Sequence, residues 1–181
     1  MTDAANPLAA KPFRLALRFR RTTFTWLAKG GETTPRPSRP EWGGRYVQLG
    51  RPDKARPIID DYLDTHPNDE GGSLTGVRAL LLAKAGQTVD ARGAIARAIE
   101  LGTGFGHFHH TAYNIAATYA ALDERDEAVT WVEAATDDGF PCYPFFARDP
   151  NLDSLREVPR FVELMSQLHK RWRNLKRVSE A

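Results

Sequence analysis

Residues 113–128 read YNIAATYAALDERDEA, and this stretch decides which fold the sequence predicts. Small and apolar residues recur at helical spacing as far as Leu122, and an acidic turn at Asp123 separates them from a second helical pattern. Ala116 precedes this turn by seven positions and Ala128 follows it by five. Alanine lets two helix backbones approach closely, so the pattern predicts two antiparallel helices joined by a short turn.

The same arrangement recurs along the chain. A turn residue is followed five positions later by alanine and four positions after that by an aliphatic residue, with offsets of 36 and 37 residues between successive sets. The sets are Gly50, Ala55 and Ile59; Gly86, Ala91 and Ile95; and Asp123, Ala128 and Val132. A period of this length is typical of stacked helical hairpins.

This periodicity predicts helices over 74–85, 88–101, 110–122 and 125–136. Residues 55–67 resemble the second helix of an earlier hairpin, closed by Pro67. The prolines and glycines that precede this stretch, including Pro40, Gly43 and Gly44, should restrict its first helix to about Arg45–Leu49.

The C-terminal part of the chain has a different pattern. Pro141, Pro144 and Pro150 exclude a long helix, whereas Pro159 suits a first helical position. An apolar stripe follows it at spacings of three and four residues: Phe161, Leu164, Leu168, Trp172 and Leu175. We expect this helix to cover the open end of the repeat stack with its apolar face.

The charge of the chain is unevenly distributed. Its 181 residues hold 25 Lys and Arg against 23 Asp and Glu, and nine of the basic but only three of the acidic residues lie within residues 1–45. We therefore predict a basic N-terminal arm over 1–44, expected to be disordered, a repeat domain over 45–140, and a proline-rich connection with a capping helix over 141–181. Phenylalanine and leucine alternate with arginine in the arm, which leaves open a weak contact with an anionic surface.

Cysteine content and hydropathy bear on the cellular location. The single cysteine, Cys142, excludes an internal disulfide and fits a reducing cytoplasm. No stretch is long and apolar enough to span a membrane, and the order of charged and apolar residues at the N-terminus does not match an export signal. We expect a cytoplasmic protein that binds no nucleic acid.

Three motifs could suggest catalysis or ligand binding. His107, His109 and His110 are metal-ligating residue types, but consecutive helical residues point about 100° apart. The Gly102–Gly106 loop lacks the lysine and the glycine spacing of phosphate-binding loops. Adjacent acidic residues, such as Asp123 and Glu124, do not face one another across a substrate and suit helix N-termini. We interpret all three as structural and expect no catalytic residue, metal or cofactor.

Residues 113–128 resemble the fifth to twentieth positions of a tetratricopeptide repeat, and the resemblance extends over roughly residues 45–178. The run GHFHHTAYNIAATYAALDERDEAVTWVEAATDDGFPCYPFFARDPNLDSLREVPRF, residues 106–161, is similar to the C-terminal repeats of large bacterial regulatory proteins. In those proteins, such arrays often follow a kinase, cyclase or winged-helix domain. The resemblance implies an all-α fold of about two and a half helical hairpins, stacked as a short solenoid with a C-terminal capping helix.

The resemblance also implies a function. Tetratricopeptide repeats hold a peptide or partner protein in a concave groove lined by the first helix of each hairpin. The matching positions here are Leu80, Ala83, Lys84, His110, Tyr113, Asn114, Ala117 and Ala121. Asn114 is the strongest single candidate, because its amide can donate to and accept from a peptide backbone. The leading hypothesis is a non-enzymatic scaffold; the alternative is a non-catalytic regulatory subunit or remnant of a bacterial kinase or transcription-regulator system.

Overall fold

The computed structural model describes residues 39–179, and this part of the chain is helical without a β-strand. The predicted all-α class is therefore confirmed for the described residues. Most of the predicted basic arm, residues 1–38, lies outside them. The elements are α1 (Arg39–Gln48), α2 (Pro52–Thr65), η1 (Glu70–Gly72), α3 (Ser73–Lys84), α4 (Thr88–Gly102), α5 (Phe108–Ala121), α6 (Arg125–Asp137), α7 (Tyr143–Phe146), η2 (Pro150–Leu155) and α8 (Pro159–Ser179).

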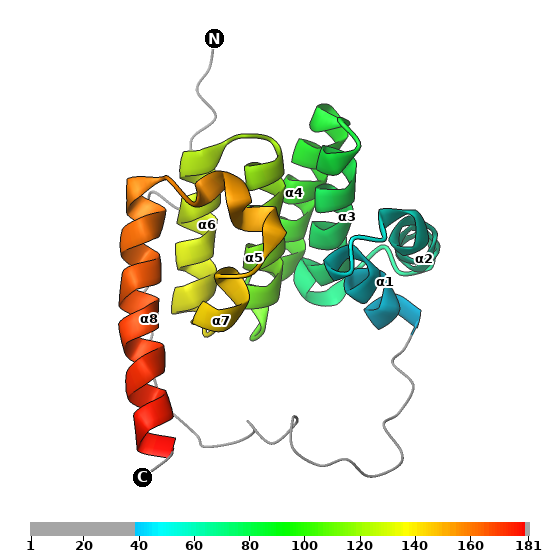
Figure 1. Ribbon diagram of the computed structural model, residues 1–181. Helices are drawn as coiled ribbons and strands as arrows, with labels where there is room; N and C mark the ends of the chain where they lie inside the picture. Colours follow the sequence, from blue (N-terminus) through cyan, green and yellow to red (C-terminus); the bar gives the residue numbers. More distant parts are fainter. Residues whose placement is uncertain (1–38, 180–181) are drawn as a thin grey trace. The chain divides into compact units, whose positions relative to one another are not determined.

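Two helix pairs form the centre of the fold: α3 packs on α4, α5 packs on α6, and α3 lies against α5 (Figure 1). The turns within the pairs contain Gly86 and Asp123, whose φ angles of 74° and 60° are left-handed. The alanines of the sequence repeat have no exposed surface: Ala55, Ala91, Ala116 and Ala128. The same is true of Ala79 in α3, Ala98 in α4 and Ala135 in α6. Small side chains therefore occupy the places where the helices approach most closely.

The four central helices begin and end within two residues of their predicted boundaries. The first helix is different, because α1 begins at Arg39 and not near Arg45 as the sequence suggested. Pro40 lies in its first turn, where a proline removes no hydrogen bond. A Cβ atom on Gly43 would lie 2.6 Å from Cγ1 of Ile59, so this glycine lets α1 pack closely against α2. A residue interpreted as a helix breaker is thus a packing residue.

The chain beyond α6 crosses back over the helix pairs. Short α7 and η2 follow the prolines, and η2 packs against both α5 and α6. Helix α8 begins at Pro159 as predicted and lies beside α6 (Figure 1). Its Phe161 and Leu168 are 1% and 3% exposed, so the first part of the predicted apolar stripe packs against the rest of the fold, whereas Leu175 at its end is exposed. Within residues 39–179, no helix combines the length and apolar character needed to cross a bilayer.

Candidate functional site

The predicted groove residues do not all face solvent. Four are buried, Asn114 is half-buried, and the remaining three are exposed. The buried residues are Leu80, Ala83, Tyr113 and Ala117, and the exposed residues are Lys84, His110 and Ala121. Only part of the set is therefore accessible to a partner in this conformation.

Tyr113 shows most clearly why the expected groove is incomplete. Its side chain is 7% exposed, its hydroxyl donates a hydrogen bond to Oδ2 of Asp149, and its ring contacts the rings of Phe145 and Phe146. Burial raises the pKa of Tyr113, and the charge of Asp149 adds to this effect. Tyr113 is therefore a packing residue and is not open to a partner as a groove position would be, because the C-terminal segment packs onto its side chain.

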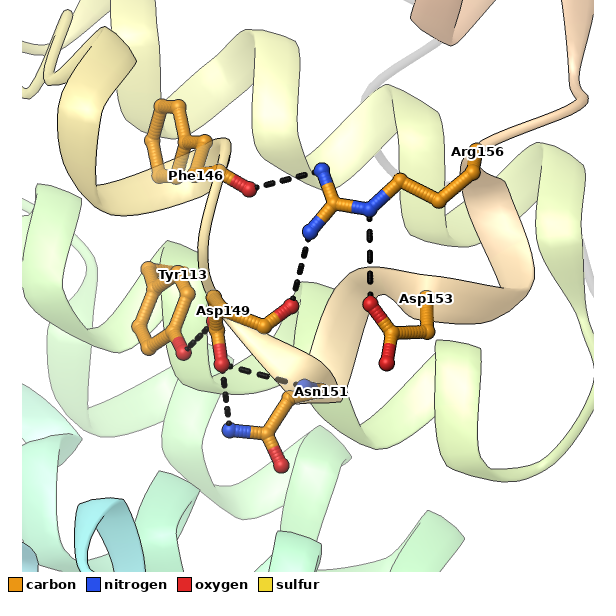
Figure 2. Close-up of polar contacts among 6 residues, drawn as sticks. All are labelled: Tyr113, Phe146, Asp149, Asn151, Asp153 and Arg156. Carbon is orange, nitrogen blue, oxygen red and sulfur yellow. Dashed lines mark hydrogen bonds and ion pairs between the residues drawn. The ribbon is translucent and has the colours of Figure 1, made fainter.

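We call the polar network of Asp149, Asn151 and Arg156 the C-terminal clasp (Figure 2). Asp149 caps η2: its Oδ1 accepts hydrogen bonds from the backbone nitrogen and Nδ2 of Asn151, at 3.0 and 2.9 Å. The Arg156 guanidinium donates to the carbonyl oxygens of Phe146 and Asp149, both at 2.9 Å. These bonds tie the ends of the loop from α7 to η2 together and satisfy a buried carboxylate. The clasp is therefore structural.

Sequence reasoning missed the clasp, although a signal for one of its residues exists. Asp149 directly precedes Pro150, and an aspartate before a proline at the first helical position is a typical N-terminal cap. No comparable signal exists for the contact with Tyr113, because 36 residues separate the two side chains in sequence.

The η2 segment also packs against α5 near Ala120. Ser154 Oγ donates to the carbonyl oxygen of Ala120 at 3.3 Å, and Leu152 and Leu155 of η2 have no exposed surface. A partner peptide could therefore reach this part of α5 only by displacing a buried apolar segment. Exposed Lys84 and Ala121 lie at the C-terminal ends of α3 and α5, whereas His110 lies in the first turn of α5.

In the first two turns of α5, His110 is exposed and Asn114 is half-buried. We call His110, Asn114 and Phe140 the open face of α5. His110 and Asn114 lie one helical turn apart on the same side of the helix. The centroid of the Phe140 ring, from the loop after α6, lies 5.6 Å from that of the His110 ring. Asn114 Nδ2 donates to the carbonyl oxygen of Ser73, 3.2 Å away at the start of α3. This bond uses only the amide nitrogen of Asn114, so the amide oxygen can accept a hydrogen bond from a partner.

The three histidines lie together but not around a common centre. The ring centroid of His109 lies 5.6 Å from that of His107 and 4.3 Å from that of His110. Nδ1 of His109 lies 3.5 Å from Oδ2 of Asp138. Within the described part of the chain, no three histidine, cysteine or acidic side chains are grouped as metal ligands would be. Burial lowers the pKa of His110, and the neighbouring imidazoles lower it further.

The other motifs occupy structural positions. In the glycine-rich loop, Gly102 lies so close to the ring of Phe108 that a Cβ atom would come within 2.3 Å of it. The carboxylates of the turn before α6 pair with arginines: Asp123 with Arg125, and Glu124 with Arg92 of α4. These acids therefore link adjacent elements.

Comparison of the chain with family models, with curated proteins and with solved structures found no match. The open face of α5 therefore has to be interpreted from its own chemistry. An imidazole, a carboxamide and a phenyl ring can together contact an apolar side chain and a peptide backbone. They include no nucleophile paired with a base, so they suit binding better than catalysis.

Proposed function

We propose that this chain is a protein-binding scaffold of the tetratricopeptide type that captures a short peptide segment of a partner protein. Two helix pairs packed through completely buried alanines support this proposal, as does the side-by-side packing of their first helices, α3 and α5. The α1 and α2 pair packs on α3, and α8 packs on α6, as a short stack with a covered end would require.

The observation that carries the proposal is the open face of α5. Asn114 lies one helical turn after His110, whose ring lies 5.6 Å from that of Phe140, and its Nδ2 donates to the carbonyl oxygen of Ser73, which fixes the orientation of the amide. A backbone N–H of an extended peptide can donate to the Asn114 oxygen while a neighbouring apolar side chain packs on Phe140 and His110. The buried centre of the predicted groove plays no part in this contact. The expected ligand is therefore short and carries at least one aromatic or large aliphatic residue.

Selection of binders from a random peptide library, displayed against the purified protein, tests this function. We expect enriched peptides to share an apolar anchor residue and to lose affinity for the double variant His110→Ala, Asn114→Ala. The matched control is Val89→Ser, because Val89 is 83% exposed on α4, away from the open face. If the peptides bind the double variant and the wild type with equal affinity, the open face is not the binding site. A failure to enrich any peptide family would count against the scaffold function itself.

A further inference from the structure

Helix α8 has two halves with different environments. Phe161 and Leu168 in its first half are buried, whereas Leu175 and Val178 in its second half are 63% and 77% exposed. The second half extends beyond α6 and α7, with Leu175 on the same helical stripe as Leu168 (Figure 1). The apolar stripe therefore continues past the part of the fold that it covers, and Leu175 and Val178 remain in contact with water.

The second half of α8 is also strongly basic. Residues 169–179, which form this half, contain five lysines and arginines and no acidic residue: Lys170, Arg171, Arg173, Lys176 and Arg177. Elsewhere among the described residues, seven arginines form ion pairs with carboxylates, for example Arg92 with Glu124 and Arg160 with Glu133. Within residues 39–179, neither Arg173 nor Arg177 has such a partner. The guanidinium groups of Arg173 and Arg177 are therefore exposed and face no carboxylate of the described residues.

We propose that the second half of α8 docks on an anionic lipid bilayer surface, a function separate from peptide capture at the open face. Cationic side chains gain electrostatic attraction at such a surface, and the adjacent apolar side chains leave water for the acyl-chain boundary. Trp172 lies between the two groups, partly covered by Tyr143 and His169, and its amphipathic ring suits the headgroup region.

A bilayer fits the combination of features better than a nucleic acid does. Phosphates of a nucleic acid would satisfy the arginines, but they would leave Leu175 and Val178 exposed to water. A protein surface would have to provide a concentrated negative charge around an apolar strip. An anionic bilayer offers both environments along the whole exposed length of the helix.

Co-sedimentation of the full-length protein with vesicles tests the proposal. We expect binding to vesicles that contain phosphatidylserine and little binding to vesicles of phosphatidylcholine alone. The variant Arg173→Gln, Arg177→Gln should bind about 25-fold more weakly, because each cation near the surface contributes about fivefold in affinity. The matched control is Lys84→Gln, Arg148→Gln, since both residues are exposed and lie outside α8. This control should bind like the wild type.

A second variant, Leu175→Ser, Val178→Ser, tests the apolar contribution, with Val89→Ser as its control. We expect the double variant to bind at least about tenfold more weakly. Its affinity for peptides at the open face should be unchanged, so the two functions can fail independently. Full binding by the Arg173→Gln, Arg177→Gln variant would overturn the proposal and place the contact in another segment. Binding that depends on the arginines but not on Leu175 and Val178 would also overturn it, and would favour a polyanion such as RNA.

Discussion

At the scale of single residues, the Tyr113 hydroxyl is the most informative group to remove. Tyr113→Phe would leave the buried Asp149 carboxylate without one of its hydrogen-bond donors while the aromatic packing remains. We expect the free energy of unfolding to fall by about 1–3 kcal/mol, measured by urea denaturation. Tyr143→Phe is the control, because Tyr143 contributes a ring stacked on His169. Equal stability of Tyr113→Phe and the wild type would show that the clasp does not hold α5.

The buried alanines set a limit on side-chain size. Ala116 has no exposed surface, so Ala116→Leu should overpack the interior and lower the free energy of unfolding by about 1–3 kcal/mol. Ala121→Leu, at an exposed position near the end of the same helix, should change stability little. Thermal or urea unfolding of the two variants distinguishes these positions. Similar losses at both would contradict the close packing at Ala116.

The histidine cluster predicts a dependence of stability on pH. The pKa of His110 is lowered in the folded state, first by burial and then by His109 and His107. The folded protein therefore binds fewer protons than the unfolded chain, and the free energy of unfolding should decrease as the pH falls through the ordinary value of 6.5. Charge on His109 would be partly offset by Asp138. Urea denaturation between about pH 7.5 and pH 5.5 should show a smaller decrease for His110→Gln than for the wild type. An unchanged pH dependence in this variant would contradict a role for His110.

At the scale of secondary-structure elements, the two halves of α8 should respond differently to truncation. Removal of residues 160–181 would expose the apolar surface that Phe161 and Leu168 cover, so we expect aggregation or a lower melting temperature. Removal of residues 173–181 takes away the exposed side chains of residues 173–178 and should leave a soluble, monodisperse protein. Size-exclusion chromatography with light scattering compares the two. A monodisperse protein with unchanged melting after the longer deletion would contradict the capping role of the first half.

The sequence predicts the boundaries of the helices better than the contacts between distant segments, for a physical reason. Helical spacing of apolar residues is a local property, so the boundaries of α3 and α5 are close to those expected. Pro40 and Gly43 are expected to act as helix breakers, because proline and glycine disfavour a helix interior. In the structure, Pro40 lies in the first turn of α1, and Gly43 allows a close contact with α2. Tyr113 is buried because residues 140–156 pack back onto α5. The helical spacing of apolar residues does not predict this packing, because it is a local property of each helix.

The resemblance places Tyr113 and Asn114 together in a groove, where replacing both by alanine would cost little stability. The structure instead predicts that Tyr113→Ala, Asn114→Ala destabilises the fold, because it removes a buried aromatic ring and the bond to Ser73. His110 and Asn114 are the pair suited to a binding test, since the first is exposed and the second is half-buried.

At the scale of the whole molecule, peptide capture at the open face of α5 is the central claim. Amide-resolved NMR of the full chain, titrated with a peptide from the library selection, tests it most directly. We expect the resonances of the Asn114 side-chain amide and of the backbone amides in the first two turns of α5 to shift in proportion to the bound fraction, whereas those of α4 do not. Shifts confined to α4, to α6 or to the second half of α8, with Asn114 unaffected, would contradict it.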